Sequence, residues 1–167
     1  MFNEQFLLQN AIEAWMRHHR MTYSLLKKLT DEQLYAEVLK PDLTSFARHF
    51  EEIARVQEAY AAAFLSGKLD FSDLPRDREY KGDKSKAELR SGLENADELV
   101  LKNIEACPAD RVIDIFGNRC SRIDLVHTLL HHELFHHGMF SVFSYDLKFN
   151  LPQDWNDFWW TAAPFDE

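Results

Sequence analysis

Residues 121–147 read SRIDLVHTLLHHELFHHGMFSVFSYDL, and this segment carries the clearest structural signal in the chain. Its apolar and histidine side chains recur at steps of three and four residues, which is the spacing of side chains on one face of an α-helix. This face consists of Leu125, Leu129, His132, His136, Met139 and Phe143. The segment therefore predicts a long helix whose buried face is interrupted by two histidines.

His132 and His136, with Glu133 between them, also spell the H-E-x-x-H signature of zinc proteases. Histidines four residues apart lie one turn apart on a helix and can bind the same metal ion. The longer protease signature requires a glycine three residues after the second histidine. This chain has Met139 there, and the only glutamate that follows is Glu167. The sequence therefore favours a metal site but not a protease.

Three earlier segments show the period of amphipathic helices. We expect these helices over residues 4–28, from 46 to about 65, and from 86 to just before Pro108. Thr44 or Ser45 can cap the second helix. Residues 111–120, RVIDIFGNRC, combine β-branched side chains with Gly-Asn and predict a short hairpin. The predicted fold is all-α, a four-helix bundle with a short hairpin before its last helix.

The composition is that of a globular chain with one core. At 167 residues and 46 % hydrophobic residues, we expect a single domain over residues 1–167. The net charge of -9 repels phosphate backbones, so nucleic acid is not an expected partner. No run of about 18 apolar residues predicts a membrane span, and the first residues lack a signal-peptide pattern. Cys107 and Cys120 are not spaced as metal ligands and are expected to be free thiols in the cytoplasm.

The expected helix at residues 46–65 also carries a histidine, His49, on its apolar face. Four-helix bundles build metal sites from inward-facing side chains of separate helices, so His49 can supply a third ligand beside His132 and His136. Imidazole binds Zn, Ni, Cu and Fe, and three protein ligands leave an open coordination position. The alternative is that each is a core histidine hydrogen-bonded to a neighbour. Three histidines on facing helices favour the metal site.

The other titratable side chains receive different expectations. Glu133 lies about 100° around the helix from His132, so we expect a solvated carboxylate or one that supports the ligands; a general base is the less favoured alternative. His19 lies on the apolar face of residues 4–28 and is a further candidate ligand or hydrogen-bond donor. The remaining expectations place His18 in solvent, His127 and His131 at the surface or an interface, and His137 at the periphery.

The chain resembles the DinB/YfiT-like family of metal-binding four-helix bundles. The resemblance rests on TSFARHFEEIARVQEAYAAAFLSG at residues 44–67 and on the segment at residues 121–147. In the family, one ligand lies near the start of the second helix and two more follow an H-x-x-x-H pattern ahead of a glycine. The matching residues here are His49, His132, His136 and Gly138. The resemblance implies a divalent metal ion and, in many members, a homodimer.

The function expected from these observations is that of a divalent-metal-dependent enzyme, with Zn or Ni as the metal. By family analogy, the reaction is transfer of a low-molecular-weight thiol of the bacillithiol type, so the partner is a small thiol or electrophile. The alternative is a non-catalytic metal-binding bundle that acts in assembly or stress response. The sequence leaves the catalytic residues unknown.

Several aromatic residues are expected to pack within the bundle or against a partner. The C-terminal group is expected to cover a bundle groove or a dimer interface; it consists of Trp155, Phe158, Trp159 and Trp160. Trp15 and Tyr60 are expected in the core, with a place in the pocket as the alternative.

Overall fold

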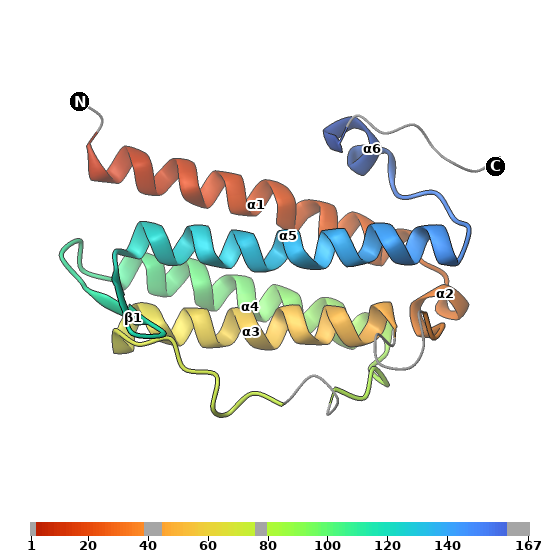
Figure 1. Ribbon diagram of the computed structural model, residues 1–167, viewed down its shortest axis with the longest axis horizontal. Coiled ribbons are helices and arrows are strands. Elements are labelled where there is room, and N and C mark those ends of the chain that lie inside the picture. Colours follow the sequence, from red (N-terminus) through yellow and green to blue (C-terminus); the bar gives the residue numbers. More distant parts are fainter. Residues whose placement is uncertain (1–2, 39–44, 76–79, 160–167) are drawn as a thin grey trace.

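The computed structural model describes residues 3–38, 45–75 and 80–159, and in these ranges it contains six helices and one two-stranded hairpin (Figure 1). The elements are α1 (Glu4–Lys28), α2 (Asp31–Tyr35), α3 (Phe46–Ser66), α4 (Lys86–Ala106), β1 (Ile113–Ile115), β2 (Asn118–Cys120), α5 (Arg122–Asp146) and α6 (Gln153–Trp159). The predicted all-helical bundle with a hairpin before its last long helix is confirmed.

The four long helices form an up–down–down–up bundle (Figure 1). α1 and α5 run in the same direction, since Glu4 pairs with Arg122 at one end and Thr22 meets His137 further along. α3 and α4 run the opposite way, and the Asn103 amide donates to the Ala61 carbonyl between them. Because α3 and α4 are parallel, the chain between them returns along the length of the bundle.

Side chains fix where the helices begin and end. Ser85 and Glu88 form a reciprocal capping box at the start of α4, and Ser121 and Asp124 form another at the start of α5. Ser45 caps α3 by accepting from an amide in its first turn; the other candidate cap, Thr44, lies outside the described residues. Gly67 ends α3 with φ of 77°, a conformation that favours glycine.

The hairpin closes the end of the bundle at which α5 begins. Phe116 and Gly117 form its two-residue turn, and both have positive φ, as a type I′ turn requires. The Leu69 amide donates to the Asp114 carbonyl at 2.9 Å, which ties the segment after α3 to β1. Both cysteines are free thiols, as expected.

The bundle interior consists of two apolar clusters with a polar layer between them. Trp15 and Leu129 belong to one cluster, and Phe50 and Phe140 belong to the other. On α1, α4 and α5, buried polar residues lie between the parts that enter the two clusters, whereas on α3 His49 and Gln57 each lie among the residues of one cluster. The polar layer contains His19, Thr22, His49, Gln57, Asp97, Glu133, His136 and His137. In the described part of the chain, no helix is long and apolar enough to cross a membrane.

Candidate metal centre

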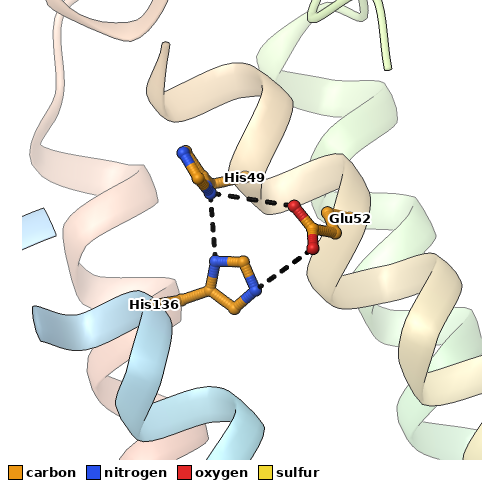
Figure 2. A group of neighbouring side chains, drawn as sticks. All are labelled: His49, Glu52 and His136. Atoms are coloured by element: carbon orange, nitrogen blue, oxygen red, sulfur yellow. Dashed lines mark hydrogen bonds and ion pairs between the residues drawn. The ribbon is translucent and has the colours of Figure 1, made fainter. Parts of the chain in front are cut away.

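One candidate metal-binding group lies where the first turns of α3 face the middle of α5. His49 and Glu52 stand one turn apart on α3, and their side chains point toward His136 of α5 (Figure 2). One ligand atom from each residue lies within 4.8 Å of the other two. His49 Nδ1 lies 3.1 Å from His136 Nδ1, and Glu52 Oε1 lies 3.9 Å from His136 Nε2. The three residues provide two imidazole nitrogens and one carboxylate around a common space.

Burial makes these imidazoles suitable metal ligands. His136 is fully buried, and burial, followed by the neighbouring His132 and His49, holds the pKa of His136 well below its usual range. Its ring is therefore neutral at physiological pH, which metal coordination requires. Glu52 is half-buried, so one side of the group faces toward solvent. Nitrogen and carboxylate donors together suit Zn, Ni or Fe.

His132 lies beside this group, on the side of the His136 ring opposite to His49. His132 Nε2 is 3.2 Å from His136 Nε2, whereas His49 approaches Nδ1 of the same ring. Burial lowers the pKa of His132, so this imidazole is also neutral. The three predicted histidines therefore lie in a row with His136 in the middle. His49 and His136 converge with Glu52, and His132 stands next to them, within reach of an ion on its side of His136.

Glu52 is the residue that sequence reasoning missed. It lies three residues after His49, and an i, i+3 pair shares one face of a helix. An H-x-x-E spacing on the same helix as a candidate ligand was the available signal. It was overlooked because glutamate is common on solvated helix faces, and the sequence alone does not show that this face turns toward α5.

A network of buried charges lies next to the candidate metal centre. His19 Nδ1 is 3.1 Å from both carboxylate oxygens of Glu133, and His19 Nε2 is 2.9 Å from Asp97 Oδ1. The Thr22 hydroxyl donates to Glu133, and His137 Nε2 lies 2.9 Å from the same hydroxyl. An anion–cation–anion arrangement therefore links α4, α1 and α5 through the core.

The electrostatics of this network follow from its geometry. Burial opposes the charged form of His19, but the Glu133 and Asp97 carboxylates outweigh it and raise the pKa of His19 to about 10. Burial likewise opposes the ionised form of Glu133, but the charge of His19 holds its pKa well below the usual value. Both groups are therefore charged at neutral pH, and their mutual hydrogen bonds offset the cost of burying them.

Two expectations for this region were wrong, and one of the alternatives for Glu133 is excluded. Glu133 is not solvated, because α5 turns it toward α1, where His19 and Thr22 bind it. His137 is buried instead of peripheral, since it packs against Trp155 of α6 with ring centroids 4.3 Å apart. His18 is also buried, because Phe158 of α6 covers its ring.

Other expectations were confirmed. His127 and His131 lie at the surface. Trp15 and Tyr60 are buried in the apolar core, and burial raises the pKa of Tyr60 to about 12. The expected place of His19 on the inner face of α1 is also confirmed, and its ring lies 3.1 Å from Glu133 there.

The fold and this group of side chains define a helical bundle with a candidate metal centre between α3 and α5. The family model of the DinB superfamily matches residues 14–140, and the chain belongs to that superfamily. The crystal structure of a DinB-like protein from Bacillus cereus ATCC 10987 is similar, with a TM-score of 0.67 and 18 % sequence identity. This similarity covers 86 % of the present chain and 95 % of the other. No curated protein sequence matches the chain.

Proposed function

We propose that this protein binds a divalent metal ion through His49, Glu52 and His136, with His132 as a further ligand. The observation that carries the proposal is the convergence of two buried imidazoles and one carboxylate from two different helices. A ligand set of this type is the form in which proteins hold Zn and Ni. Membership of the DinB superfamily supports the same conclusion.

We further propose that the centre serves a reaction of a small molecule. A divalent ion at such a site supplies Lewis acidity and lowers the pKa of a water or thiol beside it. Glu52 and His132 are both half-buried, so they border the side from which a solute can approach. Glu52 can accept a proton from that solute, while the rings of His49 and His136 fix the donor geometry from the core side.

The reaction class that we propose is thiol transfer, which rests on the family resemblance. The sulfur of a low-molecular-weight thiol forms a bond to an electrophilic carbon, the leaving group departs from that carbon, and the thiol proton passes to water or Glu52.

A second candidate function is structural: the bound metal ion would only stabilise the bundle. The position of the ligand group favours this candidate, because an ion bound by His49 of α3 and His136 of α5 would hold these two helices together.

Isothermal titration calorimetry of the metal-free protein with Zn²⁺ and Ni²⁺ measures the dissociation constants and tests the binding proposal. His49→Ala, Glu52→Gln and His136→Ala should each weaken binding by at least about 100-fold, since losing even an outer-sphere partner of a ligand costs about 10–100-fold. His127→Ala, which removes an exposed histidine from α5, and Glu98→Gln, which removes an exposed carboxylate from α4, are the matched controls. Equal affinity in the two sets of variants would contradict the proposal.

Turnover assays separate the two candidate functions. The metal-loaded protein would be assayed with a low-molecular-weight thiol and chlorinated aromatic acceptors, and halide release would be measured. Release that disappears in His136→Ala but persists in His127→Ala supports thiol transfer. No release across the acceptor panel, together with a large loss of thermal stability on metal removal, supports the stabilising role.

A further inference from the structure

A cavity of about 560 Å³ lies between the C-terminal part of α1 and the N-terminal part of α4. It is separate from the candidate metal centre, which lies between α3 and α5. α1 and α4 touch each other only sparsely, so the bundle leaves open space along this side. Pockets that bind small molecules typically have volumes of about 300–1,000 Å³. The cavity is therefore large enough for a small organic ligand.

Basic side chains dominate the rim of this cavity. Lys27 comes from α1, and Lys86 and Arg90 come from successive turns of α4. Glu94 is the carboxylate among the lining residues, which leaves a local excess of two positive charges. The whole chain carries a net charge of -9, so the residues that line this cavity have the opposite sign to the protein average. Such a cluster attracts an anion at short range.

The internal contacts of these cations leave donors available. Lys86 donates to the Leu29 carbonyl at the end of α1, and Arg90 Nε donates to Glu94 at 2.8 Å. The pairing with Glu94 uses Nε of Arg90 and leaves its two terminal nitrogens for another acceptor. Lys27 has no ion-pair partner among the residues that the structure describes.

The wall of the cavity is apolar and held in place. Leu26 and the ring of Tyr23 form part of it. The Tyr23 hydroxyl donates to Asp97 Oδ2 at 2.8 Å, which fixes the ring in one orientation. A ligand that fits these walls and this rim has an anionic group for Lys27 and Arg90 and an apolar group for Tyr23 and Leu26.

We propose that this pocket is a binding site for a small organic anion, a phosphate monoester that carries an apolar group. Arginine and lysine are the side chains that most often bind phosphate, and the guanidinium of Arg90 can form two parallel hydrogen bonds to it. The inference does not depend on the metal centre, because none of the lining residues belongs to that group.

Titration of the ¹⁵N-labelled protein with phenyl phosphate, followed by two-dimensional NMR, tests the proposal. Saturable shifts are expected at the amides of α1 around Lys27 and of α4 around Arg90. Lys27→Gln and Arg90→Gln should each weaken binding by roughly three- to tenfold. This range lies between the loss expected for an exposed ion pair and the loss expected for a charge-assisted hydrogen bond. The matched control is Lys102→Gln, which removes the same charge from an exposed position of α4 outside the cavity.

Two further probes identify which part of the ligand is recognised. Inorganic phosphate should bind more weakly than phenyl phosphate, because it lacks the group that contacts Tyr23 and Leu26. Phenol should give no saturable shift, because it carries no anionic group at neutral pH. The proposal is overturned if phenyl phosphate gives no saturable shift near the cavity, or if Lys27→Gln and Arg90→Gln bind it as tightly as Lys102→Gln does.

Discussion

His136 presents each of its ring nitrogens to a different histidine, His49 at Nδ1 and His132 at Nε2. A neutral imidazole has one nitrogen with a free lone pair, so a single ion binds His136 from one side of the ring. Glu52 lies 3.8 Å from His49 Nδ1 and 3.9 Å from His136 Nε2, so it can serve an ion on either side. The carboxylate, like His136 itself, is therefore a ligand that both possible positions share.

This arrangement predicts a ranking of ligand variants. Glu52→Gln should weaken Zn²⁺ binding by about 100-fold or more, whereas His132→Ala should weaken it by about tenfold, because His132 lies outside the converging group. Competition with a chromophoric chelator measures both constants under the same conditions. A larger effect for His132→Ala than for Glu52→Gln would show that the ion lies on the His132 side without the carboxylate.

The buried charge network predicts a pH dependence of stability. The pKa of His19 rises from an ordinary value of 6.5 to about 10 on folding, so its stabilising contribution is fully present below pH 6.5 and is lost as pH rises through about 10. The difference in unfolding free energy between the wild type and His19→Gln should therefore shrink steadily across this range. Urea unfolding of the metal-free proteins at several pH values measures it. A difference that stays constant up to pH 10 would mean that His19 is not charged in the folded protein.

At the scale of elements, the long helices follow from periodicity and capping residues, and their ends were predictable to within a few residues. α6 was not predictable, because seven residues rich in aromatic side chains show no helical period. Its role comes from tertiary packing. Trp155 is fully buried against His137, and its indole nitrogen donates to the Met21 carbonyl at 2.8 Å. α6 therefore anchors the C-terminal segment to α1 and α5.

This packing predicts unequal effects of two tryptophans in α6. Trp155→Ala should reduce the free energy of unfolding by about 3–5 kcal/mol, because it empties a buried site and removes a hydrogen bond. Trp159→Ala should change it by less than about 1 kcal/mol, since this side chain is 45 % exposed. Chemical denaturation followed by far-UV circular dichroism compares the two. Similar losses for both variants would show that α6 packs as a unit through Trp159 as well. The predicted role of Trp160 concerns a residue outside the described part of the chain.

At the scale of the whole molecule, α5 packs against two neighbours and so buries two of its faces. Its contact with α3 buries the predicted face with His136, and its contact with α1 buries the adjacent face with Glu133 and His137. A single-face period in the sequence predicts the first set of residues. The second set depends on where α1 lies in the bundle, which the period of α5 alone does not contain. For the same reason, Glu52 was missed on α3.

The most direct test of the metal centre is anomalous diffraction from crystals of the metal-loaded protein, recorded at the absorption edge of the bound metal. The proposal predicts one main peak about 2.0–2.2 Å from a nitrogen of His49, a nitrogen of His136 and an oxygen of Glu52. A main peak on the opposite side of the ring, bound by His136, His132 and Glu52 but not by His49, would place the ion in the second of the two positions. A main peak away from His49, Glu52 and His136, or no peak in protein soaked with Zn²⁺ or Ni²⁺, would contradict the assignment of this group as the metal centre.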